Sequence, residues 1–347
     1  MRLYSLLLLV IIPLRPPASA NDGFGALGAG GIVVGKTDAI ALKKEILDIS
    51  YERISVEYEF VNESTGNITS DIIFPLPAYP AEPSESGIIA AGEPGGFTVT
   101  VDGKKVRFST GVRATIGAED VTGKLRSAGF TEKEMALIRF DKTIQDDNHR
   151  LLLPADRIAA LKRNGLLSKE GDAPAWDVHV TYQWKQTFPA GTLVKVRHAY
   201  TPFIAEGTAG GFYGIDTKRF KAADPDGERF RSEFCLSESQ ADALNSLYFA
   251  KKNLDGYGQV PGTIVKYVLT TANTWKDGVR DFTLRIRAGS PEEVVALCFP
   301  EPLKKTAPAV YEVWLKNFRP KSDLGVYFGN TRQDTPSALQ LNVAPRF

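Results

Sequence analysis

The sequence contains few of the residues that build the most recognisable catalytic and metal-binding motifs. Its 347 residues include three histidines, two cysteines and two methionines. The patterns H-E-x-x-H, C-x-x-C and G-x-S-x-G do not occur, which excludes the common zinc-site and serine-hydrolase signatures. A Ser–His–Asp arrangement assembled from distant residues stays open, because geometry and not spacing defines it. The motifs therefore predict no catalytic residues, no metal ion and no cofactor.

Neither sign of charge dominates the chain. It has 42 Lys and Arg residues against 41 Asp and Glu residues, a formal net charge of +1. Nucleic-acid binding driven by phosphate neutralisation needs a basic surplus or a basic patch, and the sequence shows neither. Nucleic acid is therefore excluded as the default partner.

Long hydrophobic runs are missing, apart from a short one at the N-terminus. Arg2 precedes an apolar stretch over residues 3–14, and Ala18-Ser19-Ala20 then offers a small-residue cleavage site. This pattern predicts a signal peptide over residues 1–20. The run is shorter than the roughly 20 residues of a membrane-spanning helix, so we expect a protein that is not membrane-embedded. The mature protein should begin at Asn21 and be periplasmic or secreted.

The two cysteines, Cys235 and Cys298, suit such a compartment. An even pair in an oxidising environment is most simply a disulfide. Closing a loop of about 63 residues would stabilise the fold by roughly 4 kcal/mol in the chain-entropy model. Two separate buried thiols and a reactive cysteine are the alternatives.

Alternation of apolar and polar residues predicts a mainly β protein. It recurs over residues 54–60, 176–184 and 282–286, and each run describes a strand with one buried and one solvated face, as in antiparallel sheets. Asp102-Gly103 between short apolar runs predicts a type I′ hairpin. Further turns are expected at Pro189-Ala190-Gly191 and Lys276-Asp277-Gly278, and a loop over residues 79–96.

Helical patterns interrupt the strands in two places. Thr131 with Glu134 forms a capping box, Pro154 and Gly165 delimit a second helix, and Ser237 caps a helix that continues to Lys252. We therefore expect antiparallel β-sandwich-like halves with helical insertions. The predicted segments are an N-terminal β half (21–116), a helical connector (117–172), a C-terminal β half with one helix (173–330) and a loosely ordered tail (331–347).

Two glycine-rich patterns imitate nucleotide-binding motifs. Residues 23–28 spell G-x-G-x-x-G and residues 30–37 spell G-x-x-x-x-G-K-T. The first pattern needs a preceding strand, for which the mature N-terminus leaves no room. The second contains Ile32, Val33 and Val34, which favour extended backbone. We predict a flexible glycine-rich segment that leads into a first strand and binds no nucleotide.

Two polar clusters have simple structural interpretations. Asp224, Asp226 and Glu228 lack the spacing of an EF-hand, so a polar turn is expected, with a weak calcium site as the alternative. Asn62 and Asn67 begin glycosylation sequons, and we interpret them as the turn between two strands.

Several short runs resemble an uncharacterised family of exported bacterial proteins that carries a domain-of-unknown-function label. The resemblance covers residues 21–330 and implies a periplasmic, mostly β protein, without catalytic residues or substrate. The runs that carry it are Asn21-Asp22-Gly23 with Leu27 and Gly30-Gly31-Ile32, Phe74-Pro75-Leu76-Pro77, residues 182–191, and His198-Ala199-Tyr200-Thr201-Pro202.

These observations favour a non-catalytic binding or interaction module in the bacterial envelope, with an unknown envelope protein or a small ligand as its partner. An envelope hydrolase with an unrecognised site is the main alternative, followed by a role in surface assembly.

A glycine-rich segment over residues 210–213 is the candidate ligand-binding loop, because glycines permit close backbone approach and aromatic rings can stack on a ligand. A mobile loop without a ligand would explain the glycines equally well. The candidate ligand-binding residues are His198, Tyr200, Gly210, Gly211, Phe212 and Tyr213.

Overall fold

The computed structural model describes most of the chain. The described residues are 23–28, 31–82, 90–91, 96–138, 143–144, 151–169, 173–202, 204–205, 211–214, 225–255 and 259–331. The predicted signal peptide (1–20), Gly210 and the predicted tail beyond residue 331 lie outside these ranges.

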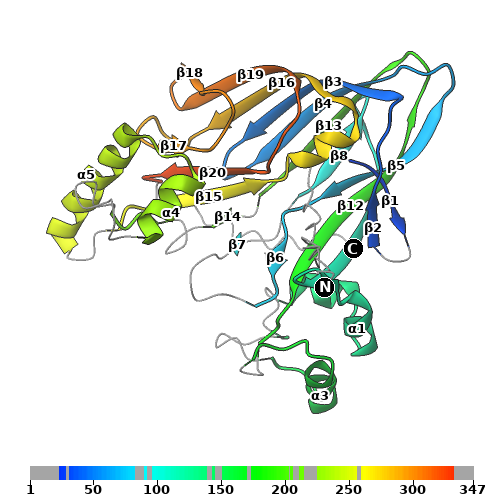
Figure 1. Cartoon of the computed structure of the whole chain (residues 1–347), viewed down its shortest axis with the longest axis horizontal. Coiled ribbons are helices and arrows are strands. Elements are labelled where there is room, and N and C mark those ends of the chain that lie inside the picture. The colour runs from blue at the N-terminus through cyan, green and yellow to red at the C-terminus, as the bar shows by residue number, and fades with distance from the viewer. Residues whose placement is uncertain are drawn as a thin grey trace, which may run out of the picture.

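A large sheet of eight strands combines distant parts of the chain (Figure 1). Its neighbouring strands are antiparallel, except that β16 and β3 run parallel. Strands from residues 21–116 and from residues 173–330 share this sheet. Their order is β18 (Lys304–Ala307), β19 (Val310–Phe318), β16 (Lys276–Arg287), β3 (Ile40–Ile49), β4 (Ile54–Asn62), β13 (Leu193–Tyr200), β8 (Thr98–Val101) and β9 (Lys104–Lys105).

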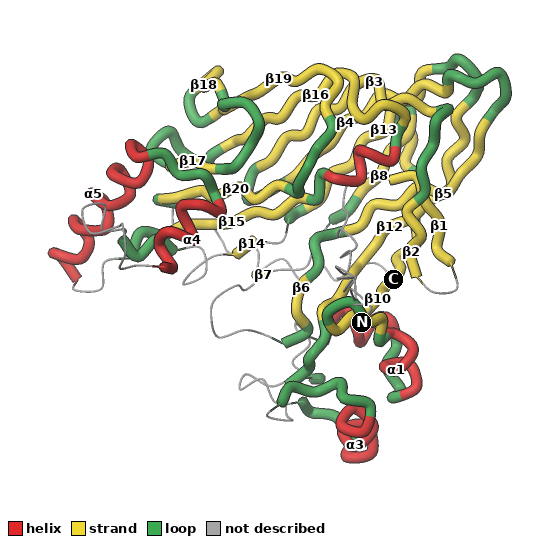
Figure 2. The backbone as a smooth tube through the Cα atoms, in the orientation of Figure 1, coloured by secondary structure: helices red, strands yellow, loops and turns green. Residues whose placement is uncertain are grey.

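Two further antiparallel sheets complete a mainly β fold, as predicted (Figure 2). The seven-stranded sheet has the order β11 (Glu119–Asp120), β10 (Ser109–Ile116), β12 (Asp177–Phe188), β5 (Ile68–Pro75), β1 (Gly23–Gly28) and β2 (Gly31–Val34), and β6 (Tyr79–Pro80) pairs with β12. The five-stranded sheet has the order β17 (Val294–Ala296), β20 (Leu324–Gly329), β15 (Gly262–Tyr267), β14 (Ile204–Ala205) and β7 (Ala90–Ala91).

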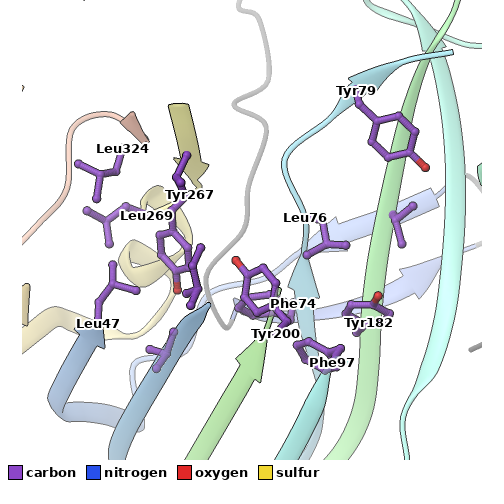
Figure 3. Close-up of a cluster of buried hydrophobic side chains, with 14 of the residues drawn as sticks. Leu47, Phe74, Leu76, Tyr79, Phe97, Tyr182, Tyr200, Tyr267, Leu269 and Leu324 are labelled. Carbon is purple, nitrogen blue, oxygen red and sulfur yellow. The ribbon is translucent and has the colours of Figure 1, made fainter. Parts of the chain in front are cut away.

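Both smaller sheets pack on the same inner face of the large sheet. From the seven-stranded sheet, the rings of Phe74 and Trp184 lie 5.2 and 5.1 Å from the His198 ring of β13. From the five-stranded sheet, the Tyr267 hydroxyl lies 3.4 Å from the Tyr58 hydroxyl of β4. Figure 3 shows part of the continuous core that results, with Tyr200 among its labelled side chains. Neither smaller sheet therefore covers the outer face of the large sheet.

The labelled α-helices lie at the periphery, beside the five-stranded sheet and beyond the end of β12 (Figure 1). The predicted capping box is confirmed: the Glu134 amide donates to Thr131 Oγ1 at 3.1 Å, and the Thr131 amide donates to Glu134 Oε2 at 2.8 Å. Ser237 and Gln240 exchange equivalent bonds at the start of α5. The elements are α1 (Thr122–Ser127), α2 (Glu132–Leu137), α3 (Ala155–Arg163), α4 (Pro225–Glu233), α5 (Glu238–Asp255) and the 3-10 helix η1 (Thr270–Thr274).

Local turn chemistry was predicted correctly at most of the turns. Asp102 and Gly103 have φ values of 47° and 77° and join the paired strands β8 and β9, as a type I′ turn requires. The sequon region 62–69 connects β4 to β5 as expected. Asn62 is fully buried, with its side-chain amide donating to the carbonyl oxygens of Gly66 and Phe188, so its amide has a structural role.

Several predictions about local structure are wrong. The expected loop over residues 79–96 contains the short strands β6 and β7, and Tyr79 of β6 is only 4% exposed. Asp277 and Gly278 do have positive φ, but they form an irregularity within β16, where the register to β3 shifts, and not a turn between strands. The glycine-rich residues 23–28 form strand β1 itself, because β2 and β5 supply antiparallel partners. The expected polar turn at Asp226 and Glu228 is helix α4, which begins at Pro225, a residue suited to a first helical position.

Cys235 and Cys298 form the predicted disulfide, with their Cα atoms 4.9 Å apart. Cys235 lies in the short connection between α4 and α5, and Cys298 lies two residues beyond β17. The bond therefore attaches this pair of helices to the five-stranded sheet. The side of α4 and α5 that faces this sheet builds a second, smaller core with Phe234, Leu244 and Tyr327.

Candidate functional site

The outer face of the large sheet carries a pocket of about 640 Å³, which we call the sheet pocket. Its lining comes from four consecutive strands, β3, β4, β13 and β8, and from the turns next to them. A volume of this size falls in the range of small-molecule sites. The polar and charged lining residues are Lys44, Arg53, Glu57, Glu59, Thr98, Thr100, Lys195 and Arg197.

Strand alternation explains why these side chains face outward. On β4 and β13, the intervening residues Tyr58 and Val196 are buried in the core, and successive side chains of a strand point to opposite faces. Lys44 reaches the outer face because the register between β3 and β4 shifts between Leu42 and Lys44, as it does at a β-bulge. The pattern that buries one face thus concentrates charge on the other.

Two ion pairs cross the middle of the sheet pocket. Lys195 pairs with Glu59 at 3.5 Å and Arg197 with Glu57 at 3.4 Å, and each pair joins directly opposite residues of β13 and β4. The side chains of Lys195 and Arg197 are more than half exposed. Exposed pairs of this kind contribute at most about 1 kcal/mol, so a ligand could rearrange them at little cost.

Two further cations line the sheet pocket without an ion-pair partner. Within the part of the chain that the structure describes, neither Lys44 nor Arg53 forms a salt bridge. The lining therefore holds four cations against two carboxylates, an excess of two positive charges. A concave site with unpaired cations of this kind favours anionic ligands.

Threonine hydroxyls contribute neutral hydrogen-bonding groups at the β8 side of the sheet pocket. Thr98 Oγ1 donates to the Ala199 carbonyl at 3.2 Å, which leaves its lone pairs to accept a bond. Thr100 lies directly opposite Arg197. The site thus combines charge recognition with groups that can exchange hydrogen bonds with ligand hydroxyls.

The candidate residues predicted from the sequence lie in two separate regions. His198 and Tyr200 are 0% and 1% exposed on the inner face of β13, where burial raises the pKa of Tyr200 above its usual range. Phe212 belongs to the second core, and Tyr213 beside it is 49% exposed. The structure does not bring these two groups together, and their role in ligand binding stays a prediction.

The close approach of a neighbouring side chain accounts for Gly211. A Cβ atom at this position would lie 1.9 Å from Gln259 Nε2, so a larger residue would displace Gln259. Phe212 next to it exchanges two backbone hydrogen bonds of 2.9 Å with Val260. Packing alone therefore explains this glycine.

A hydroxyl–imidazole contact lies on the seven-stranded sheet. Thr115 Oγ1 and His179 Nε2 are 2.9 Å apart, and burial, reinforced by the charge of Arg113, lowers the pKa of His179 from 6.5 to about 4. Thr115 is only 6% exposed, so its hydroxyl is poorly placed to reach a substrate. The His179 side chain is half-buried.

Over the described ranges, no group of three His, Cys, Asp or Glu side chains is arranged to hold a metal ion. In the same part of the chain, no helix has the length and apolar character needed to cross a bilayer.

Comparisons with known proteins find one family match and structural matches of low sequence identity. A family model described as Domain of unknown function (DUF4424) matches residues 20–327, and no curated protein matches the chain. A "putative nutrient binding protein" of Legionella pneumophila superposes with a TM-score of 0.41 and 16% identity, covering 90% of this chain and 72% of that one. An M1 zinc metallopeptidase of Deinococcus radiodurans superposes with a TM-score of 0.25 and 9% identity, covering 85% and 44%.

Proposed function

We propose that this chain, which belongs to the family described as Domain of unknown function (DUF4424), is a non-catalytic binding protein whose sheet pocket takes a small anionic ligand. The ligand would carry carboxylate or phosphate groups. The observation that carries the proposal is the pair of cations, Lys44 and Arg53, that line the sheet pocket without a partner among the described residues.

The placement of the charges supports binding over a purely structural role. Some other cations on the same face are paired: Arg285 contacts both Glu312 and Asp48, and Lys316 contacts Asp281 at 2.9 Å. Guanidinium groups match carboxylate and phosphate oxygens in a bidentate fork, and ammonium groups act as point charges. A ligand anion would give Lys44 and Arg53 a partner, as Glu59 and Glu57 do for Lys195 and Arg197.

The proposed location is the bacterial envelope. The support is the signal-peptide pattern of residues 1–20 together with the disulfide between Cys235 and Cys298, because disulfides persist in oxidising compartments and are rare in the cytosol. An envelope binding protein would meet its ligand outside the cytoplasm.

Titration calorimetry with citrate, a compact tricarboxylate, tests the proposal. We expect measurable binding that weakens as salt is added, because screening reduces exposed charge interactions. Arg53→Gln and Lys44→Gln should each weaken binding about tenfold, since hydrogen bonds to charged groups contribute about 1.5–3 kcal/mol.

Lys185→Gln is the matched control. Lys185 is an exposed cation on β12, paired with Asp71, and lies outside the sheet pocket, so its variant should bind citrate as the wild type does. Equal affinities for all four proteins, or no binding at all, would contradict the proposal.

A further inference from the structure

An exposed tryptophan lies on the same face as the sheet pocket. Trp314 of β19 is 50% exposed, while its neighbour Val313 is buried on the inner face. The strand pairings place Trp314 opposite Thr283 of β16, and Thr283 opposite Ile46 of β3. Ile46 lines the sheet pocket, so one cross-strand row connects the indole to the pocket.

This row continues through the pocket itself. Ile46 lies opposite Glu57, Glu57 opposite Arg197, and Arg197 opposite Thr100. Adjacent strands are about 4.8 Å apart, so Trp314 lies about 10 Å from Ile46 across the sheet. Thr283 is the one residue of this row between them, and it is 8% exposed, so neighbouring side chains cover it. A ligand that contacts both the indole and the pocket would lie across the side chains that cover Thr283.

The exposure of Trp314 distinguishes it from the other tryptophans. The sequence contains four, and Trp176, Trp184 and Trp275 are between 1% and 4% exposed. A partner that covers this ring would remove apolar surface from water, which is favourable. An indole offers such a partner a flat apolar face and one N–H donor.

We infer that the sheet pocket and Trp314 together bind an acidic oligosaccharide, with one sugar ring stacked on Trp314 and a carboxylate of a neighbouring sugar in the pocket. This inference rests on the proposed function and names its ligand class. A sugar ring has an apolar C–H face that suits the indole, and its hydroxyls suit Thr98 and Thr100. A uronate carboxylate would form ion pairs with Lys44 and Arg53. An extended chain of sugars would span the row, which a single small anion cannot do.

Acrylamide quenching of tryptophan fluorescence tests the inference directly, because Trp314 is the exposed member of the four. Trigalacturonate should protect Trp314 from quenching, and citrate should bind without protecting it. Maltotriose, a neutral trisaccharide, should neither bind measurably nor protect Trp314 at the same concentration. Trigalacturonate should also bind about tenfold more tightly than galacturonate, because it adds a stacked ring and two further carboxylates to the contacts of the monomer.

Variants separate the two parts of the site. Trp314→Ala should weaken trigalacturonate binding about tenfold and leave citrate affinity unchanged, and Trp314→Phe should restore part of the loss. Phe249→Ala is the matched control, since Phe249 is a 52% exposed aromatic on α5, and it should change neither affinity.

The outcomes distinguish the inference from the function on which it rests. If citrate binds but trigalacturonate binds no tighter than galacturonate and leaves Trp314 quenchable, the saccharide is wrong and the anion pocket stands. If Phe249→Ala weakened trigalacturonate binding as much as Trp314→Ala does, the role of Trp314 would also be wrong. If neither citrate nor a galacturonate binds, both the saccharide inference and the proposed anion-binding function are wrong.

Discussion

Acidification should destabilise this protein through His179, and the size of the effect follows from its surroundings. Burial is the main cause of its lowered pKa, and the positive charge of Arg113 adds to it, while Asp120 acts in the opposite direction. In the unfolded chain His179 would titrate at its ordinary pKa of 6.5, whereas in the folded protein it titrates at about 4. The unfolded chain therefore takes up a proton first as the pH falls.

The sign and magnitude come from proton linkage. Stability due to neutral His179 is fully present above pH 6.5, declines as the pH falls from 6.5 to 4, and changes little below that range. A pKa difference of one corresponds to about 1.4 kcal/mol, so the loss reaches about 3 kcal/mol at pH 4. That is a large share of a typical unfolding free energy of about 5–15 kcal/mol.

Urea denaturation of the wild type and His179→Gln at a series of pH values between 7 and 4 measures this loss. Glutamine keeps a polar group for Thr115 but does not titrate. The difference in unfolding free energy between the two proteins should shift by about 3 kcal/mol across this range, in favour of the variant at low pH. Parallel pH profiles would refute the reasoning, because they would show that His179 has the same pKa in both states.

Two further predictions concern the disulfide and export. Cys235→Ala and Cys298→Ala should lower the melting temperature equally, because each removes the same cross-link, worth roughly 4 kcal/mol in the chain-entropy model; clearly unequal losses would show that one thiol has a separate structural role. N-terminal sequencing of the protein recovered from a bacterial periplasm should begin at Asn21, and a cytoplasmic product that retains residues 1–20 would contradict the envelope location.

Local features of the fold could be predicted because they depend on neighbouring residues. Alternation identified β4, β12 and much of β16, since each has one face in the core and one in water. The Asp102-Gly103 turn and the Thr131 capping box depend on four consecutive residues each. Helix α4 was missed because Pro, Asp and Gly at its start are also turn residues, and packing of Phe230 and Phe234 in the second core stabilises it as a helix.

Long-range features could not be predicted in the same way. The parallel pairing of β16 with β3 joins residues that are more than 200 positions apart, and no local pattern records it. The sheet pocket was missed for this reason. Arg53, Glu57 and Glu59 stood out only as the polar phase of a strand, and their proximity to Lys195 and Arg197 depends on the order of strands in the sheet.

Chemical-shift mapping with citrate tests the central claim most directly, because it reports where on the protein an anion binds. On an isotope-labelled sample, the account predicts that backbone amide shifts concentrate at the four strands of the sheet pocket, including Lys44, Thr100 and Arg197, and that Arg53→Gln weakens them. Shifts that are spread evenly over the surface, or that cluster around Phe212 and Tyr213 instead, would contradict it.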